Sequence, residues 1–275
     1  MKVVITSTKN ILCLLEILKV IKNLSQDVSL CFQQDEVYIQ VMDHSHICLF
    51  DTHINRNWFE VYEVESDEVI SLNVTILLKI INLYTINTSV ELSTTDDSDR
   101  LTVILKYPDM VKEFEIPLMD IDFDYLQTGE NDYGCDFEMH TKILDKHISE
   151  LMIFGEVLNF KCKNETLQLA ASGNDGAMSI KIPESTLESL SVEEGRTIKS
   201  KVDIKYISYI SKLSASFKNV SISFDDQYPL FVNCKDEGIS LKYFVAPKFD
   251  DDDQDGNDSD NDSDVENTVM GNADI

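Results

Sequence analysis

The chain repeats its own pattern of elements after about 130 residues, and this internal repeat limits the possible folds more than any other feature. A helical stripe of apolar residues opens at Ile11, and a second opens 132 positions later at Ile143. The strand pattern around Val37 is matched 130 positions later around Leu167. Because each copy mixes helices with strands, the sequence predicts an α+β fold built from two copies of one domain.

Each copy is predicted to contain two helices and several strands. The helices fall at residues 11–21, 75–84, 143–151 and 204–213, and Asn73 and Asp203 are suited to cap the second and the fourth. The predicted strands fall at 28–32, 37–41, 89–93, 101–106 and 112–116 in the first copy, and at 157–160, 166–169, 178–182, 220–224 and 230–234 in the second.

Two segments do not fit the repeat. Residues 118–134 contain two glycines and alternate acids with large apolar residues, which predicts an extended connection. Residues 250–275 contain 11 acids and no Lys or Arg, so we expect them to be disordered. The predicted division is an N-terminal domain at 1–117, an interdomain connecting loop at 118–134, a C-terminal domain at 135–249 and an acidic tail at 250–275.

Composition excludes several classes of protein. The 275 residues are 43% hydrophobic and carry 23 basic and 50 acidic side chains, for a net charge of −27, which argues against binding to an anionic membrane. No apolar run approaches the roughly 18–20 residues that span a bilayer. The six cysteines are scattered, and no signal peptide precedes them, so we expect a reducing compartment. Without a phosphate-binding or nucleophile motif, we predict no enzyme, metal or cofactor.

Lysines recur on the polar faces of all four predicted helices. On one helix such lysines form an ordinary solvated face, but four helices at equivalent repeat positions favour a common basic surface. Lysine gives point charges that suit phosphates, and no aromatic or amide cluster indicates base reading, so this surface suits a phosphate backbone that is contacted without regard to sequence. The candidate phosphate-binding residues are Lys9, Lys19, Lys22, Lys79, Lys142, Lys146, Lys205 and Lys212.

Five short motifs, in order, carry a resemblance to a known family. They are LEILK at 15–19, MDHSH at 42–46, LMDID at 118–122, ASG at 171–173 and LKYFVAPK at 241–248. Together they resemble the proliferating cell nuclear antigen (PCNA) family of sliding clamps, over residues 1–249. The resemblance implies a two-repeat clamp fold that closes as a homotrimeric ring, with helices around a central hole and sheets outside. It also implies an outer surface that repels DNA.

The same resemblance implies how subunits join. In the family, one edge strand from each half pairs between subunits, which uses up exposed sheet edges. The corresponding interface residues here are Phe114, Ile116, Met178, Ile180 and Ile182.

A client-binding pocket is implied as well. Family clamps hold the PIP box, a short motif of client proteins, beneath the connecting loop. The matching positions are Met42, His46, Ile47, Leu49, Leu126, Thr128, Tyr228, Pro229, Phe244, Ala246 and Pro247. This chain has Thr128 and Gly129 where the family usually has Ile and Pro, and Asn164 where many members have a ubiquitin-modified lysine. The implied partners are double-stranded DNA, DNA polymerase, a clamp loader and PIP-box proteins such as flap endonuclease and DNA ligase.

Two other interpretations remain open from the sequence. One is a subunit of a heterotrimeric checkpoint-type clamp. The other is a metal-dependent enzyme, since the histidines of His44-x-His46 would share one face of a strand near Asp43, Asp51 and His53. The Lys-, Ile- and Asn-rich composition indicates an AT-rich genome, such as that of a protist or a large DNA virus. The expected location is therefore the nucleus, or a cytoplasmic viral replication site.

Overall fold

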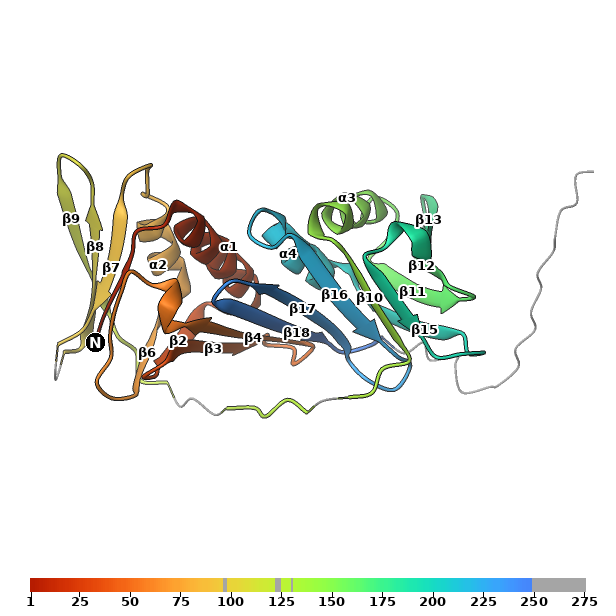
Figure 1. The fold of residues 1–275 in the computed structure, drawn as a ribbon, viewed down its shortest axis with the longest axis horizontal. Coiled ribbons are helices and arrows are strands. Elements are labelled where there is room, and N and C mark those ends of the chain that lie inside the picture. Colours follow the sequence, from red (N-terminus) through yellow and green to blue (C-terminus); the bar gives the residue numbers. More distant parts are fainter. Residues whose placement is uncertain (96–97, 122–124, 130, 249–275) are drawn as a thin grey trace, which may run out of the picture.

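Four helices lie along one side of three antiparallel sheets (Figure 1). The computed structural model describes residues 1–95, 98–121, 125–129 and 131–248. The predicted acidic tail at 250–275 lies outside these residues. In the part of the chain that is described, no helix is long and apolar enough to cross a membrane.

The first half of the chain supplies two of the α-helices. Its elements are β1 (Lys2–Ile5), α1 (Thr8–Leu24), β2 (Asp27–Phe32), β3 (Glu36–Met42), β4 (Cys48–Asn55), the 3₁₀ turn η1 (Arg56–Trp58), β5 (Val61–Glu63), β6 (Glu68–Asn73), α2 (Val74–Ile81), β7 (Ser89–Ser93), β8 (Arg100–Lys106) and β9 (Val111–Pro117).

The second half repeats this order. Its elements are β10 (Cys135–His140), α3 (Thr141–Leu151), β11 (Val157–Lys163), β12 (Thr166–Gly173), β13 (Gly176–Pro183), the 3₁₀ turn η2 (Glu184–Thr186), β14 (Ser189–Val192), β15 (Ile198–Asp203), α4 (Ile204–Ser211), the 3₁₀ turn η3 (Lys212–Ala215), β16 (Asn219–Phe224), β17 (Leu230–Asp236) and β18 (Ile239–Val245).

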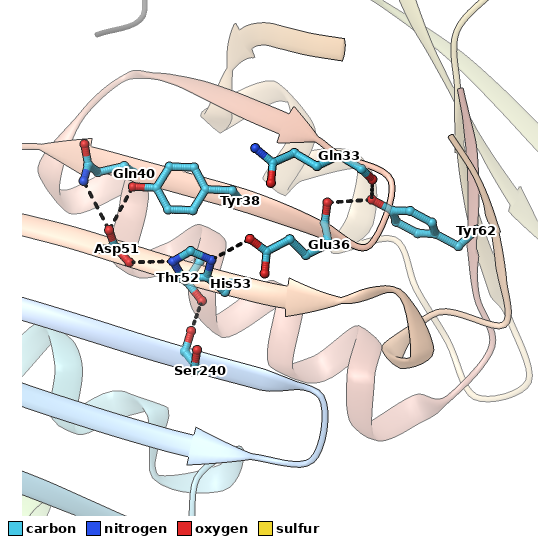
Figure 2. Close-up of polar contacts among 9 residues, drawn as sticks. All are labelled: Gln33, Glu36, Tyr38, Gln40, Asp51, Thr52, His53, Tyr62 and Ser240. Atoms are coloured by element: carbon cyan, nitrogen blue, oxygen red, sulfur yellow. Dashed lines mark hydrogen bonds and ion pairs between the residues drawn. The ribbon is translucent and has the colours of Figure 1, made fainter. Parts of the chain in front are cut away.

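The two halves share one central sheet. Its nine strands run β14-β10-β16-β17-β18-β4-β3-β2-β6, with a five-stranded sheet β5-β1-β7-β8-β9 at one end of the molecule and a four-stranded sheet β13-β12-β11-β15 at the other (Figure 1). The halves meet where β18 pairs antiparallel with β4, from Ile239 opposite Ile54 to Val245 opposite Cys48. The Thr52 hydroxyl also donates to the Ser240 carbonyl across this junction, at 2.8 Å (Figure 2).

All four predicted helices are confirmed, with shifted ends. Helix α1 starts three residues earlier and ends three later than the apolar stripe, and the Ser7 hydroxyl accepts from the Asn10 amide at 3.3 Å. Both predicted caps are confirmed, because Asn73 accepts from the Thr75 amide at 3.1 Å and Asp203 accepts from the Lys205 amide at 3.1 Å. Each helix buries its apolar stripe against the sheets, which leaves the lysine faces outward.

The connecting segment after β9 crosses the sheets on the side opposite the helices (Figure 1). The nearly buried side chain of Gln40 on β3 forms two hydrogen bonds with the backbone of Leu126 in this segment. The Gln40 amide nitrogen donates to the Leu126 carbonyl, and the Leu126 amide donates to the Gln40 side-chain oxygen, both at 2.9 Å. The ring of Tyr125 lies 5.0 Å from that of Tyr38, so two neighbouring residues of the segment are held on the sheet.

A chain of polar contacts orients Gln40 (Figure 2). The Asp51 carboxylate accepts from Gln40 at 3.2 Å and from the Tyr38 hydroxyl at 2.8 Å. His53 lies between two acids, with one ring nitrogen 3.3 Å from Asp51 and the other 2.9 Å from Glu36. Burial alone would raise the pKa of Asp51, but its hydrogen bonds from His53, Tyr38 and Gln40 hold that pKa below its usual value.

We predict that Gln40→Ala frees the connecting segment without unfolding the sheet. The substitution removes both hydrogen bonds to Leu126, so hydrogen exchange of the Leu126 amide should accelerate while the thermal midpoint changes little. Gln168→Ala is the matched control, since Gln168 also lies on a sheet surface but bonds only to the exposed Ser179. Equal hydrogen-exchange rates of the Leu126 amide in both variants would contradict a role of the Gln40 hydrogen bonds in holding the segment.

His53 should make stability depend on pH. Its hydrogen bond to Asp51 raises the pKa of His53, burial opposes this, and Glu36 adds to the rise. Because the folded pKa exceeds the unfolded value of about 6.5, the stabilisation is fully present below that pH and is lost as the pH rises through the folded pKa. Thermal midpoints from about pH 5.5 to about pH 9 should therefore decline more steeply for the native chain than for His53→Gln.

Candidate functional site

The predicted lysine surface exists on the helix side of the molecule. All eight candidate lysines are exposed, and their helices lie together on one side of the sheets (Figure 1). Lys9 stands in the first turn of α1 rather than before it, and Lys212 opens η3 rather than ending α4. The helices therefore present their positive groups on the face that points away from the sheets.

Half of these lysines are engaged by acids of the same chain. Lys212 lies 2.9 Å from Asp145. The other three pairs are Lys9 with Asp236 at 2.5 Å, Lys146 with Glu150 at 3.9 Å and Lys205 with Asp203 at 3.3 Å. Within the described residues, no ion pair involves Lys19, Lys22, Lys79 or Lys142, so these four are the ones poised for an external anion.

A cavity of about 270 Å³ lies on the opposite side, under the connecting segment. It sits where the ends of β3, β4 and β18 meet, and its walls are mainly apolar. Eight of the eleven predicted pocket residues line it, namely Met42, His46, Ile47, Leu49, Thr128, Pro229, Phe244 and Ala246.

The carboxylate of Asp43 shapes one wall of this cavity. It accepts from the amides of Ile47 at 2.8 Å and Cys48 at 2.7 Å, and from the Tyr206 hydroxyl at 2.8 Å. Burial alone would raise the pKa of Asp43, but these hydrogen bonds outweigh it and hold the pKa below its usual value. Since Tyr206 belongs to α4, the loop beside the cavity is tied to a helix on the far side of the sheet.

Three predicted pocket residues do not line the cavity. Leu126 is held by Gln40 and is 44% exposed, the Tyr228 ring packs on Tyr133 at 5.8 Å, and Pro247 lies beyond Ala246. Sequence reasoning missed the lining residues Cys48, Gly129 and Asn131. Their positions beside Ile47 and Thr128 were the available signal.

The two predicted interface strands are confirmed as sheet edges. β9 ends the five-stranded sheet and β13 ends the four-stranded sheet. Phe114, Met178 and Ile180 are partly buried on them, and thus keep some apolar surface. Ile116 and Ile182 are only 1% and 7% exposed, so their side chains belong to the core of their own subunit.

Apolar side chains that the sequence did not single out are exposed near both edges. Helix α2 contacts β9, and α3 contacts β13. The exposed residues in and around these elements are Ile76, Leu83, Met110, Val111, Ile143, Met152 and Ile153. Such residues extend each edge into an apolar surface of the kind that subunits bury.

The histidine cluster does not have the predicted geometry. His44 and His46 lie in a turn rather than on one face of a strand, and His46 has a positive φ of 56°. His53 lies apart from them on β4, between Glu36 and Asp51. Within the described ranges, no group of three or more His, Cys, Asp and Glu side chains is arranged to hold a metal.

One sheet face carries a cluster of lysines that the sequence analysis did not single out. The outward face of the four-stranded sheet carries five lysines, namely Lys161, Lys163, Lys181, Lys199 and Lys201. Helix periodicity could not reveal this cluster, because its members come together only through strand pairing.

Comparisons with known proteins agree with this geometry. The family model described as "Proliferating cell nuclear antigen, N-terminal domain" matches residues 7–127, and the C-terminal domain model matches residues 127–249. The proliferating cell nuclear antigen of the fungus Chaetomium thermophilum is 25% identical over 246 residues, covering 86% of this chain and 95% of that protein.

A solved structure shares the fold. It is a complex of PCNA2 and PCNA3 from Sulfolobus tokodaii, with a TM-score of 0.81 and 21% identity, covering 90% of this chain and 99% of the compared one. The predicted two-repeat clamp fold is confirmed by this likeness and by the family models. With both domain models matched in order across nearly all of its described residues, the chain belongs to the proliferating cell nuclear antigen family of sliding clamps.

Proposed function

We propose that three copies of this chain close into a ring that encircles duplex DNA and tethers DNA polymerase and other replication and repair proteins. The observation that carries the proposal is the division of the molecule into two opposite faces. Lysine-bearing helices occupy one face, and an apolar cavity under the connecting segment occupies the other. A ring needs the first face for DNA and the second for its clients, and performs no chemistry itself.

Ring closure is supported by the repeat itself. By order along each repeat, β9 of the first half is equivalent to β18 of the second half. Likewise, β13 of the second half is equivalent to β4 of the first half. Within the chain, β18 pairs with β4. An equivalent pairing of β9 with β13 of the next subunit would continue the sheets and satisfy both open edges.

The repeat also gives the register of that junction. The pair Leu101–Ile116 on β8 and β9 is equivalent to the pair Leu230–Val245 on β17 and β18. In the same way, Leu169–Ile180 on β12 and β13 is equivalent to Ile39–Thr52 on β3 and β4. Transferring the β18–β4 register to β9 and β13 places Phe114 opposite Met178 of the next subunit, where Tyr243 lies opposite Phe50 within the chain. On the outward face, Glu115 then lies opposite Ala177.

DNA binding is supported by charge alone. The four unpaired lysines can contact phosphates without breaking an ion pair, and such contacts carry no base information, so a closed ring can slide. The enclosed DNA would be retained by topology. A clamp loader is the expected agent of opening, because a closed ring cannot be threaded onto DNA without ends.

Client binding is supported by the shape and the chemistry of the cavity. An apolar hollow of this size accepts the anchoring side chains of a short helical turn. Polymerase, flap endonuclease and DNA ligase with PIP boxes are the proposed clients. The domain boundaries at 117, 135 and 249, a nuclear or viral replication site, and the origin in an AT-rich genome stay predictions.

A heteromeric clamp is the second candidate, because the compared archaeal structure is a complex of two different PCNA subunits. A cysteine pair distinguishes it from the homotrimer. In Glu115→Cys/Ala177→Cys, oxidation should link three copies covalently, while Glu113→Cys/Ala177→Cys, one pair out of register, should not. A native chain that sediments as a monomer and a first variant that stays unlinked would contradict the homotrimer.

Neutralising the unpaired lysines should weaken DNA binding most. In Lys22→Gln/Lys79→Gln/Lys142→Gln, polymerase stimulation should fall, and the salt slope of DNA binding should drop by about 0.9 for each phosphate that a lysine no longer neutralises. The matched variant Lys9→Gln/Lys205→Gln/Lys212→Gln should be affected less, since those lysines are already engaged by acids. An equal or reversed order would contradict the division into paired and unpaired lysines.

Polar substitution at the cavity should abolish client binding and leave the ring intact. Leu126→Ser/Pro229→Ser removes one apolar residue beside the cavity and one from its wall. A PIP-box peptide should lose about 2 kcal/mol or more, about 30-fold in affinity, measured by calorimetry. Val69→Ser, an exposed apolar position on β6, is the control. Unchanged peptide affinity in the double variant would place the client site elsewhere.

A further inference from the structure

The four-stranded sheet carries a concentrated positive surface that the proposed function does not use. We name the five lysines of its outward face the outer lysine patch: Lys161, Lys163, Lys181, Lys199 and Lys201. Strand register brings them together. Lys161 lies directly opposite Lys199 on β15 and opposite Gln168 on β12, which in turn faces Lys181 on β13.

Acids are scarce on the strands that carry Lys161, Lys163, Lys181 and Lys199. Among the residues of β11, β12, β13 and β15, Asp203 is the single acid, and it is engaged by Lys205 at 3.3 Å and Lys248 at 3.8 Å. No ion pair involves Lys161, Lys163, Lys181 or Lys199 within the described residues.

The five-stranded sheet at the other end of the molecule shows the ordinary arrangement. There Glu91 lies 3.4 Å from Lys2 and 2.6 Å from Lys106, and Arg100 lies 3.8 Å from Glu115. Each positive group on that face has a neighbouring carboxylate. The outer lysine patch is therefore a local departure in a protein with a net charge of −27.

Like charges directly opposite each other on neighbouring strands are destabilising, since their Cβ atoms lie only about 4.5–5.5 Å apart. The pair Lys161 and Lys199 has this relation, and Lys163 and Lys201 add charge on the same two strands. A polyanion across the patch would relieve the repulsion.

The sequence that follows the described residues supplies such a polyanion. The Lys248 amide donates to the Lys201 carbonyl at 2.7 Å, so the chain leaves the folded body beside the patch. Four consecutive acids, Asp250 to Asp253, begin two residues later. Two to five residues of chain span at most about 7–18 Å, enough to reach Lys199 and Lys161 from Lys248.

We propose that the acidic segment 250–275 binds in cis to the outer lysine patch, with Asp250 to Asp253 against Lys199 and Lys161. Tethering beside the patch gives these acids an effective concentration of about millimolar, which favours them over a free anion. The bound segment neutralises an outward surface that would otherwise attract DNA phosphates. This inference does not depend on ring closure or on client binding, and it is tested without either.

The test is zero-length carbodiimide cross-linking of the full chain, followed by trypsin and mass spectrometry. Residues 249–275 contain no Lys or Arg, so trypsin releases them as one peptide. That peptide should be linked to Lys161 and Lys199 at about 0.01 M ionic strength, where the Debye length is about 30 Å, and unlinked at about 1 M, where it is about 3 Å. Links to Lys235 and Lys242, outward lysines of the central sheet, should be absent.

Two full-length variants with equal charge change sharpen the test. One neutralises the near acids, and the other neutralises four acids farther along. In the first, links to the patch should disappear and lysine acetylation at Lys161 and Lys199 should rise several-fold; in the second, both should stay close to native. The variants are D250N/D251N/D252N/D253N and D255N/D258N/D260N/D262N.

Three results would overturn the proposal. The first is the absence of links between the acidic peptide and the patch at low salt. The second is equal behaviour of the two variants. The third is strong protection of Lys161 and Lys199 from acetylation when a short DNA duplex is added to the native chain, which would assign the patch to DNA instead.

Discussion

The antiparallel pairing of β18 with β4 is the contact on which the rest of the architecture depends. It joins the last strand of the second half to a strand of the first, so that one nine-stranded sheet runs through both. Because the halves are repeats joined in one sheet, their helices fall on the same side of it and their outward strand faces fall on the other. Lysines placed at equivalent helix positions thus gather on one face.

The two faces are also connected through the sheet. Asp43 holds the turn beside the cavity, and its carboxylate accepts from Tyr206, whose neighbour Lys205 is on the lysine face. The Tyr243 hydroxyl donates to the Tyr206 carbonyl at 3.1 Å, which fixes the same helix to β18. A displacement of α4 therefore reaches the cavity wall through one short hydrogen-bonded path. The fold therefore connects the lysine-bearing helix side of the molecule to the cavity on the opposite side.

The structural elements that depend on a periodic apolar pattern could be predicted from the sequence. Helices and caps were predictable because the apolar stripe beginning at Ile11 and the side chains of Asn73 and Asp203 act locally. Strand β4 was not predicted, because the fully buried Thr52 places a polar residue among the inward positions and interrupts the apolar alternation of Cys48, Phe50 and Ile54. Pairing across the sheet is equally invisible to local patterns.

The candidate site divides in the same way. Eight of the eleven cavity-lining residues could be inferred from the family resemblance, and four of these eight lie within the motifs MDHSH and LKYFVAPK. Two of the four ion pairs could not be inferred, since Lys9 and Asp236 are 227 positions apart and Lys212 and Asp145 are 67 apart. The outer lysine patch was missed for a related reason. Lys161 and Lys199 become neighbours only when β11 and β15 pair.

The connecting segment is attached on both sides of the cavity, which explains how it can tolerate Thr128 and Gly129. On one side Leu126 is clasped by Gln40, and on the other the Tyr133 hydroxyl donates to the Pro229 carbonyl at 3.1 Å.

A Cβ atom added at Gly129 would meet no atom within 4 Å, so steric crowding does not require glycine there. Glycine instead enlarges the range of backbone conformations over the cavity. The backbone at Gly129 therefore has conformational freedom between two fixed points, the hydrogen bonds of Leu126 to Gln40 and of Tyr133 to Pro229.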